Sequence, residues 1–406
     1  MIHGRGVDLS MKILQIAPYF IPYIGGQEIY IKNLCKYLIK KGHDIDLIVS
    51  NFPKSKKRER YEGINIFRYS CIIRPLRNPI SPSFFIPDQE IKGYDVIHTH
   101  NEHSYAAITS IFHSVSKRKP LVITCHGQLF FGNPIIDFIE KIYSKIIGKI
   151  IFTKANAIIV LSSSDKKYVE SLGIKPEKIH IIPNGIDPIE LNTDQLSNQE
   201  IESFRVKNNL SNKFIILFVG QIIHRKGILY LLYSIPLIIK KTKKNVLFLF
   251  IGNGDYYYES LNLVKELEIE KNTLFTGSVS KKDLIAFYQS SNLFILPSLS
   301  EGLPTTILEA MYFNLPVISS DIPGVRDHFA DHAILVQPRD SQKIADAVIH
   351  ILDNEELARE LSSKGKEFIL SHYTWDKIIC EYEKIFLNLK NTEIEPINEK
   401  IKTFFR

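Results

Sequence analysis

Short apolar runs, each followed by a stretch with helical periodicity, recur along most of the chain and restrict its fold more than any other feature. Phe214–Val219 and Val246–Ile251 are apolar at every position, which is typical of strands buried on both faces of a parallel sheet. Strands that alternate with helices predict βαβ units, with parallel strands and helices on both faces of the sheet. The pattern therefore predicts an α/β fold with doubly wound sheets.

The alternation occurs twice, and a polar segment at 188–213 separates the two series. With 406 residues the chain has room for about two domains of ordinary size. We expect a Rossmann-like domain over 1–188, a second over 189–373, a final helix over 374–390 and a polar tail over 391–406. Ligands of such sheets bind beyond the carboxyl ends of the strands, so we expect a site in a central cleft that both domains face.

The composition limits the partners and the compartment. A formal net charge of +7 suits anionic partners, but the basic residues are spread and not interleaved with aromatic residues on one compact module, so we expect no nucleic acid partner. Four cysteines without a CxxC pair indicate free thiols in a reducing cytoplasm. No apolar run approaches the roughly 20 residues of a membrane span. Residues 1–10 lack a signal-peptide core, and we expect either an extension before Met11 or a mis-assigned start codon.

The segment 296–319, LPSLSEGLPTTILEAMYFNLPVIS, predicts a strand end, a tight turn, a helix and the next strand. Pro304 suits the first turn of a helix, and Gly302 lets a ligand approach the backbone. A helix N-terminus binds phosphate, whereas the carboxylates of Glu301 and Glu309 accept hydrogen bonds from sugar hydroxyls. Phosphate and sugar together indicate a nucleotide-sugar, although a helix cap and a solvated side chain explain either glutamate alone equally well.

A basic turn, GQIIHRKG, follows the apolar run at Phe214–Val219. The planar fork of Arg225 and the point charge of Lys226 both suit a diphosphate, and Gly227 opens the next helix. The alternative is a solvated basic turn that binds nothing.

The motif SEGLPTTILEAM resembles the signature of the large family of retaining glycosyltransferases called family 4 or group 1, which have the GT-B fold. The resemblance extends from Met11 to about Leu387. It implies a metal-independent enzyme of hexosyltransferase type that uses a UDP- or GDP-linked sugar, retains the anomeric configuration and needs no further cofactor. It also implies a glycan or lipid-linked acceptor, in the synthesis of cell-surface polysaccharide or glycolipid.

In the family pattern G-R-x-x-x-x-K-G, basic residues hold the pyrophosphate of the donor, and the match assigns this role to Arg225 and Lys226. Gln221 stands where the family has its first Arg, which leaves more of the charge to that pair. The resemblance places Glu301 near the transferred sugar and Glu309 at the ribose. It also implies that the final helix crosses back onto the N-terminal domain.

The sequence Cys125-His126-Gly127 ends a predicted strand and resembles the family segment T-x-H-G, whose His faces the donor sugar; a structural His is the alternative. The residues expected to act in catalysis are His126, Glu301, Lys226 and Arg225. The other residues that the resemblance assigns to the donor site are Gly25 and Gly26 in a glycine loop, Gly252 and Gly254 along the nucleotide, Ser278 and Val279 at the base, and Gly302, Leu303, Pro304, Thr305 and Glu309 in the segment 296–319.

Two patterns raise the question of a metal. His98 and His100 lie on one face of a predicted strand, but the sequence supplies no further cluster of zinc ligands. Asp44 and Asp46 match the D-x-D metal motif of the other main glycosyltransferase fold, yet they enter a predicted strand. We therefore expect no metal site.

Two charged segments have ordinary explanations as well as functional ones. KSKKRER at 54–60 is expected to be a surface loop. A long helix is expected over 134–153. The basic residues on or beside this helix are Lys141, Lys145, Lys149 and Lys154. Such an amphipathic helix fits either an anionic membrane surface on the cytoplasmic side or ordinary packing with a solvated lysine face.

Other functions are compatible with the same fold. A nucleotide-sugar epimerase or a sugar-phosphate synthase is one alternative, and a non-catalytic nucleotide-sugar-binding protein is another. Intact Glu301, Glu309, Lys226 and His126 argue against the non-catalytic protein. We expect acceptor specificity in the N-terminal half, in loops such as the Pro-rich segment 72–87.

Overall fold

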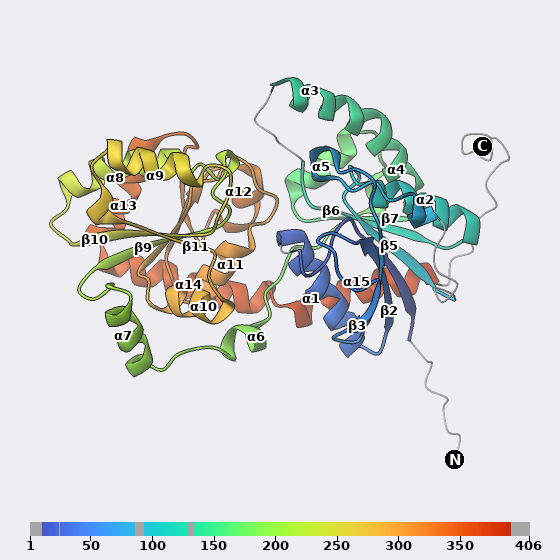
Figure 1. Ribbon diagram of the computed structural model, residues 1–406, viewed down its shortest axis with the longest axis horizontal. Coiled ribbons are helices and arrows are strands. Elements are labelled where there is room, and N and C mark those ends of the chain that lie inside the picture. Colours follow the sequence, from blue (N-terminus) through green and yellow to red (C-terminus); the bar gives the residue numbers. More distant parts are fainter. Residues whose placement is uncertain (1–9, 24, 86–92, 129–133, 391–406) are drawn as a thin grey trace, which may run out of the picture. The chain divides into compact units, whose positions relative to one another are not determined.

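The computed structural model describes residues 10–23, 25–85, 93–128 and 134–390; the expected polar tail lies outside these ranges. The chain divides into two compact units, each built around one sheet (Figure 1). The first comprises the described parts of Met1–Gly127, Phe138–Pro183 and Trp375–Arg406, and the second those of Gln128–Asp137 and Asn184–Thr374.

The first unit contains an eight-stranded sheet in the order β3-β4-β2-β1-β5-β6-β7-β8. The strands are β1 (Lys12–Ile16), β2 (Asp44–Ser50), β3 (Arg58–Tyr61), β4 (Ile64–Tyr69), β5 (Val96–His100), β6 (Leu121–Cys125), β7 (Ala157–Val160) and β8 (Ile179–Ile181). All neighbours are parallel except β3 and β4, which pair antiparallel at the edge. The strand order reverses between β1 and β5, so their carboxyl ends mark the place where such sheets bind ligands.

Helices cover both faces of this sheet. The helices of this unit are α1 (Gly26–Lys40), α2 (Tyr105–Lys117), α4 (Lys149–Lys154), α5 (Ser163–Ser171), α15 (Trp375–Lys390) and, from Phe138 onward, α3 (Pro134–Tyr143). α1 and α15 pack together on one face, whereas α2, α4 and α5 enclose an apolar core on the other. A π-helical turn at Ser144–Gly148 joins α3 to α4, so the long helix expected over 134–153 is one helical column with an irregular turn in it.

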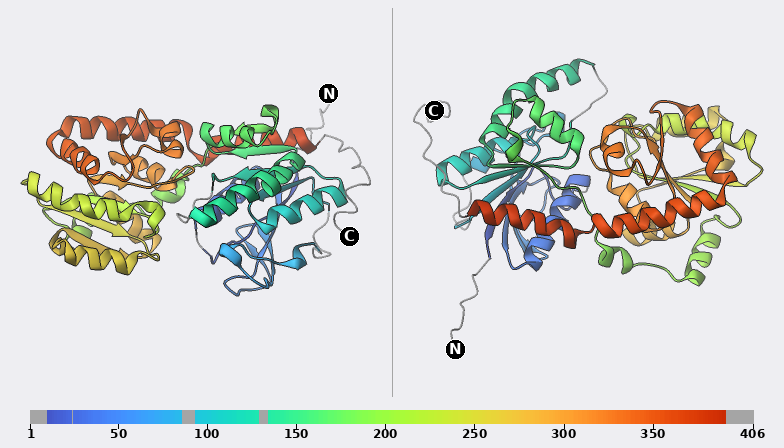
Figure 2. Two further views of the ribbon diagram at one scale, coloured as in Figure 1. Left: turned by 90° about the horizontal axis from the view of Figure 1, so that it is seen from above. Right: turned by 180° about the vertical axis from the view of Figure 1, so that it is seen from behind.

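The final helix, α15, belongs to the first unit and packs against α1. Figure 2 shows it in red along that face of the sheet. Trp375 and Tyr382 are fully buried, and the indole ring of Trp375 lies 5.3 Å from the ring of Tyr30 in α1. Tyr382 also shares a hydrogen bond with the Tyr30 hydroxyl. Because burying each large side chain contributes about 1.5–3 kcal/mol, these aromatic residues stabilise the packing of α15 on α1.

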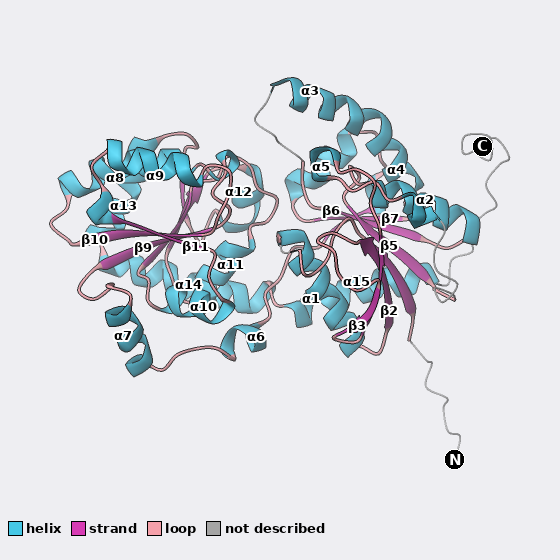
Figure 3. Ribbon diagram, viewed as in Figure 1, coloured by secondary structure: helices cyan, strands magenta, loops and turns pink. Residues whose placement is uncertain are grey.

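The second unit contains a six-stranded parallel sheet in the order β11-β10-β9-β12-β13-β14. Its strands are β9 (Phe214–Val219), β10 (Val246–Ile251), β11 (Thr273–Gly277), β12 (Leu293–Leu296), β13 (Val317–Ser320) and β14 (Ile334–Val336). Its helices are α6 (Pro188–Asn192), α7 (Asn198–Lys207), α8 (Ile228–Lys241), α9 (Tyr257–Glu266), α10 (Lys281–Gln289), α11 (Thr305–Tyr312), α12 (Pro323–Phe329), α13 (Ser341–Asp353) and α14 (Glu355–His372). α8, α9 and α13 lie on one side, and α10, α11 and α14 on the other (Figure 3). The strand order reverses between β9 and β12.

These two sheets confirm the prediction of two Rossmann-like α/β domains. One local prediction is wrong: residues 58–60 of the expected charged loop belong to β3. β3 is an edge strand, which tolerates charged side chains, and its Glu59 pairs with the buried Arg68 of β4 at 2.7 Å. The sequence analysis also missed α5, although Ser162 and Asp165 have the spacing of a helix cap, and the Ser162 side chain accepts a hydrogen bond from the Asp165 amide.

Candidate active site

In the second unit, the loops after β9 and β12 meet in a cluster of charged side chains. Glu301 forms ion pairs with Lys226 (Nζ to Oε1, 2.6 Å) and with Arg225 (Nη1 to Oε2, 3.1 Å). Arg225 also donates to the carbonyl oxygen of Ser300, and the Ser298 hydroxyl donates to Glu301. The structure therefore joins three of the four residues expected in catalysis, at the position where the strand order of this sheet reverses.

The electrostatics of this cluster favour an anionic ligand. Burial by itself raises the pKa of the Glu301 carboxyl, but the charges of Lys226 and Arg225 outweigh the burial and hold the pKa below its usual value. Glu301 is thus ionised at neutral pH. Two cations and one carboxylate leave a net positive charge, at side chains that are 11% exposed for Lys226 and 33% exposed for Arg225.

Close backbone contacts explain why several predicted positions are glycine. Gly227 has φ +67°, and a Cβ there would overlap the carbonyl oxygen of Pro297. A Cβ on Gly252 or Gly254 would overlap the backbone of the loop that follows β9. These glycines let the loops after β9, β10 and β12 pack directly on one another. This packing gives Gly252 and Gly254 a structural role, and their assignment to the nucleotide stays a prediction.

Glu309 lies in α11, and its partner is a tyrosine and not a basic residue. The Tyr288 hydroxyl donates to Glu309 Oε2 at 2.9 Å, and burial raises the pKa of this carboxyl to about 7. Glu301 and Glu309 therefore differ in charge state near neutral pH, although the sequence shows them as a matched pair.

The remaining predicted residues of the second unit lie at the ends of strands and at a helix terminus. Gly302, Leu303, Pro304 and Thr305 form the turn into α11, and a Cβ on Gly324, at the start of α12, would overlap the carbonyl oxygens of Glu301 and Gly302. Gly324 was not singled out in the sequence; its place directly after Pro323, which suits the first turn of a helix, is the signal. Ser278 follows β11 and accepts a hydrogen bond from Asn253 at 3.1 Å, with Val279 beside it.

In the first unit, the glycine loop leads into α1. Gly25 is the N-cap of α1 and Gly26 is its first residue. A Cβ on Gly25 would contact the carboxylate of Glu28, which folds back towards the helix N-terminus. Burial raises the pKa of Glu28 to about 7.

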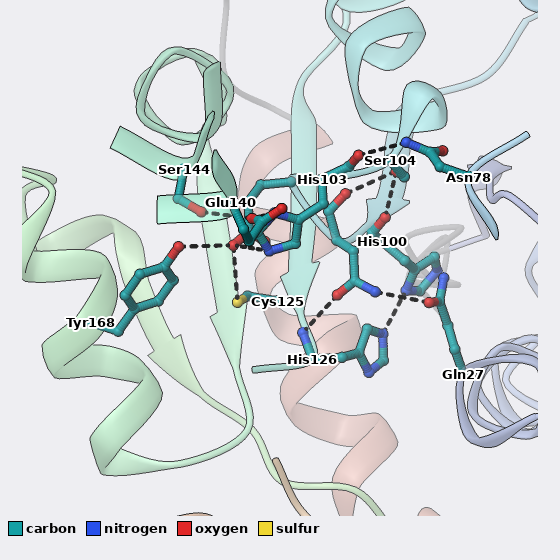
Figure 4. Close-up of polar contacts among 12 residues, drawn as sticks. Gln27, Asn78, His100, His103, Ser104, Cys125, His126, Glu140, Ser144 and Tyr168 are labelled. Carbon is teal, nitrogen blue, oxygen red and sulfur yellow. Dashed lines mark hydrogen bonds and ion pairs between the residues drawn. The ribbon is translucent and has the colours of Figure 1, made fainter. Parts of the chain in front are cut away.

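His126, which follows β6, contacts residues at the end of β5 (Figure 4) and a tyrosine of α1. Its amide donates to Asn101 Oδ1 at 3.0 Å, and its Nε2 lies 3.3 Å from Nδ1 of His100. The ring packs edge-on against Tyr30, with 4.7 Å between centroids. Burial lowers the pKa of His126 to about 4, so the imidazole is neutral at physiological pH and can exchange hydrogen bonds without adding charge.

Asn101 is a positioning residue that the sequence analysis missed. It adopts a left-handed conformation (φ +57°), which Asn tolerates better than most residues. Its Oδ1 accepts from the His126 amide, and its Nδ2 donates to Gln27 Oε1 in the first turn of α1 at 2.9 Å. Asn101 therefore links the ends of β5 and β6 to the first turn of α1. The signal in the sequence was an Asn directly after a predicted strand.

The side chains of the two possible metal patterns hydrogen-bond or form ion pairs with neighbouring protein residues. His98 Nε2 lies 2.8 Å from the Thr124 hydroxyl, and His100 Nε2 lies 3.2 Å from Gln15 Oε1. Asp46 is buried at the amino end of β2, away from the ligand edge, and pairs with Lys12 at 2.9 Å. Within the described ranges, no group of three or more His, Cys, Asp or Glu side chains has the arrangement of a metal site.

A second charged cluster lies in the first unit between α3 and the end of β5, near His126. The imidazole of His103 contacts Glu102 at 3.0 Å and Glu140 at 2.5 Å, and the Tyr168 hydroxyl donates to Glu102 (Figure 4). Burial by itself lowers the pKa of His103, but the two carboxylates outweigh it and raise the pKa to about 10. His103 is therefore a buried cation. The sequence analysis assigned no role to His103.

Two family models match the chain and agree with the two units. The model for Glycosyltransferase Family 4 matches residues 24–190, and the model for Glycosyl transferases group 1 matches residues 200–368. With two Rossmann-like domains, these matches define a glycosyltransferase of the GT-B fold. The chain belongs to the group 1 glycosyltransferases, as the segment 296–319 predicted.

The relatives extend over almost the whole chain. It is 26% identical to an uncharacterized glycosyltransferase of Methanocaldococcus jannaschii, and the alignment covers 94% of this chain and 100% of that protein. It is 23% identical to N-acetyl-alpha-D-glucosaminyl L-malate synthase of Bacillus anthracis, over 93% of this chain and 97% of that protein. The solved structure of Anabaena HepE in complex with UDP-glucose superposes on this chain with a TM-score of 0.76 at 18% identity. The superposition covers 93% of this chain and 100% of the HepE chain. Among the helices that the structure describes, none has the length and hydropathy of a membrane span.

Proposed function

We propose that this glycosyltransferase moves a hexose from a UDP- or GDP-linked donor to a glycan or lipid-linked acceptor, with retention of the anomeric configuration. The observation that carries the proposal is the cluster of Lys226, Arg225 and Glu301 at the strand reversal of the second sheet. It offers a concentrated positive charge and a carboxylate acceptor side by side. A sugar nucleotide needs both, because its diphosphate is anionic and its sugar carries hydroxyl donors.

The charges suit the departure of a diphosphate. As the bond between the anomeric carbon and the diphosphate breaks, negative charge grows on the departing oxygen, and Lys226 and Arg225 stabilise it electrostatically. Glu301 keeps both cations in place before the donor arrives and accepts a hydrogen bond from the sugar as positive charge develops on its ring. Neutral His126 serves the sugar as a hydrogen-bond partner. The acceptor attacks from the face that the diphosphate leaves, which is the route usually proposed for the family.

The relatives support the donor class. HepE binds UDP-glucose, and the Bacillus anthracis relative is named for an N-acetylglucosaminyl product. We propose a uridine nucleotide as the first donor to test. Acceptor choice is assigned to the first unit, including loop 72–85, and the protein is proposed to work in the cytoplasm in polysaccharide or glycolipid synthesis, without a cofactor or a nucleic acid partner.

A donor panel tests the proposal. The purified protein is incubated with UDP- and GDP-linked hexoses, and released nucleoside diphosphate and free sugar are measured. Slow release of diphosphate with one donor, lost in Lys226→Ala, supports transfer. Interconversion of the donor into its epimer, without release of diphosphate, supports the epimerase instead. Rapid turnover with a free sugar phosphate as acceptor supports the synthase, and tight binding with neither reaction supports the non-catalytic protein.

A further inference from the structure

The contacts of His126 leave one of its ring nitrogens for a ligand. Its amide donates to Asn101 Oδ1, and its Nε2 lies 3.3 Å from Nδ1 of His100. Within the ranges that the structure describes, no protein group hydrogen-bonds to Nδ1 of His126. A neutral imidazole carries one proton, so it donates from one nitrogen and accepts at the other. The role of Nδ1 towards a sugar therefore depends on which nitrogen holds that proton.

The contact with His100 continues into the interior of the first sheet. Gln15 interrupts the apolar run of β1, KILQI, and is fully buried, as is His100 at the end of the neighbouring strand β5. Gln15 Oε1 lies 3.2 Å from Nε2 of His100. Gln15 Nε2 has no hydrogen-bond partner among the described residues, so the oxygen contact is the one that engages this side chain. We call Gln15, His100 and His126 the imidazole chain.

The direction of each hydrogen bond in the imidazole chain follows from its buried end. A carboxamide oxygen only accepts, so Nε2 of His100 carries the proton of that ring. Burial lowers the pKa of His100 well below its usual value, so the ring holds no second proton and its Nδ1 accepts. Nε2 of His126 must then be the donor. Because burial lowers the pKa of His126 to about 4, this ring is also neutral, and its Nδ1 is an acceptor.

Aromatic packing fixes the plane of the His126 ring. Tyr30 of α1 meets this ring edge-on at an angle of 88°, and its centroid also lies 5.9 Å from that of His100. Tyr30 is held in turn by α15, through the indole ring of Trp375 at 5.3 Å and a hydrogen bond with Tyr382. Rotation of the His126 ring about its Cβ–Cγ bond would break the contact with His100, and the packing around the ring opposes that rotation.

We propose that Gln15 is a positioning residue, which fixes the proton of His126 on Nε2 through His100 and thereby presents Nδ1 of His126 as a hydrogen-bond acceptor. The group that Nδ1 receives is a hydroxyl of the bound sugar, which donates at this point. A proton that is fixed before the sugar binds spares the site a reorganisation during the reaction. The role towards the sugar rests on the proposed function, whereas the position of the proton does not.

The position of the proton can be measured directly. Long-range proton–nitrogen correlation spectra of the full chain with nitrogen-labelled histidine distinguish a protonated ring nitrogen from an unprotonated one, and His126→Gln identifies the signals of His126 by their loss. In the parent at neutral pH we expect the proton on Nε2. Gln15→Met keeps the length of the side chain but removes the acceptor, so His126 should no longer show a single tautomer. The matched control, Ile13→Met, changes a buried residue on the same face of β1 and should leave the tautomer unchanged.

Donor hydrolysis tests what the fixed proton does. Turnover should fall about tenfold in Gln15→Met, as for the loss of one well-placed hydrogen bond, while affinity for nucleoside diphosphate stays within about twofold because its proposed site lies in the second unit. A protonated Nδ1 of His126 in the parent, a result that needs no variant of Gln15, would overturn the proposal. Unchanged tautomer or turnover in Gln15→Met, or equal loss of turnover in Ile13→Met, would also overturn it. If the parent hydrolyses no donor, the proposed function fails, and the spectra still decide where the proton lies.

Discussion

The two units treat charge in opposite ways at the strand ends where their candidate residues lie. In the second unit, Lys226, Arg225 and Glu301 are all ionised and paired with one another. In the first, His100 and His126 hydrogen-bond to each other, and burial lowers the pKa of both, so they are neutral. A diphosphate is stabilised by positive charge that is already in place, whereas a sugar hydroxyl can also hydrogen-bond to a neutral partner that both donates and accepts. The difference agrees with a division of labour between the nucleotide and the sugars.

The buried cation His103 is the exception in the first unit, and its removal should have the largest effect. His103→Gln leaves Glu102 and Glu140 facing each other without a counter-charge. Breaking a buried ion pair in this way costs roughly 3–5 kcal/mol of unfolding free energy. Urea unfolding followed by circular dichroism measures the loss, with the exposed His350→Gln as control. An equal change in both variants would show that the cluster contributes nothing to stability.

The same cluster predicts how stability changes with pH. The folded-state pKa of His103 is about 10, against about 6.5 unfolded, so its contribution is complete below pH 6.5 and is lost as the pH rises through 10. The pKa values of Glu102 and Glu140 are lowered, because the His103 charge outweighs their burial, so their contribution is lost on acidification. The decline in stability from pH 6.5 to 10 should be shallower in His103→Gln than in the parent.

Lys226→Ala tests the charged side of the comparison and should have the next largest effect. Charge-assisted hydrogen bonds contribute roughly 1.5–3 kcal/mol, so donor use should fall about ten- to a hundredfold. Calorimetric titration with nucleoside diphosphate and initial rates with the donor measure it, and the exposed Lys265→Ala serves as control. If Lys226→Ala binds nucleoside diphosphate as well as the parent does, the assignment of the diphosphate site is wrong.

The two glutamates should respond differently to the same substitution. Glu301→Gln removes the carboxylate that neutralises Lys226 and Arg225, so affinity for nucleoside diphosphate should hold or rise while turnover falls about tenfold. Glu309→Gln should mainly weaken nucleotide binding, because Glu309 is assigned to the ribose. Binding constants and turnover numbers are measured for both variants. A drop in diphosphate affinity in Glu301→Gln as large as in Glu309→Gln, with turnover intact, would identify the motif as a structural helix cap.

The pH dependence of nucleotide affinity should depend on Glu309 of the second unit and not on His126 of the first, and this effect is smaller. The pKa of Glu309 is about 7, so its ionised form, the better acceptor for ribose, grows as the pH rises through 7. Nucleotide affinity should therefore rise by about fivefold across this range, which corresponds to the difference of about 1 kcal/mol between charged and neutral hydrogen bonds. Glu309→Gln should remove this part of the profile. His126→Gln should leave it unchanged, because the pKa of about 4 keeps His126 neutral throughout.

Chelation should have the smallest effect. The positive charge at the proposed diphosphate site comes from Lys226 and Arg225, so activity should persist in EDTA. Loss of activity that Mn²⁺ or Mg²⁺ restores would return Asp44 and Asp46 to consideration as ligands. Donor hydrolysis in the presence and absence of chelator is the measurement.

Much of the architecture and the family could be predicted from the sequence, because both depend on short-range patterns. Apolar runs of the length of a strand, alternating with helical periodicity, define two parallel sheets. Proline, glycine and charged residues at fixed spacings define the turns at their ends. These patterns can be read without knowing any long-range contact. Examples are the strands Phe214–Val219 and Val246–Ile251 and the segment 296–319.

The tertiary structure alone decided which side chains meet, because those contacts join residues far apart in the chain. Glu301 pairs with Lys226 across 75 positions, and Asn101 links His126 to Gln27. The charge state of His103, in the turn after β5, depends on Glu140 in α3. A sequence gives the periodicity of a helix, but the rotation of that helix on its domain is set by the partners that it finds after folding.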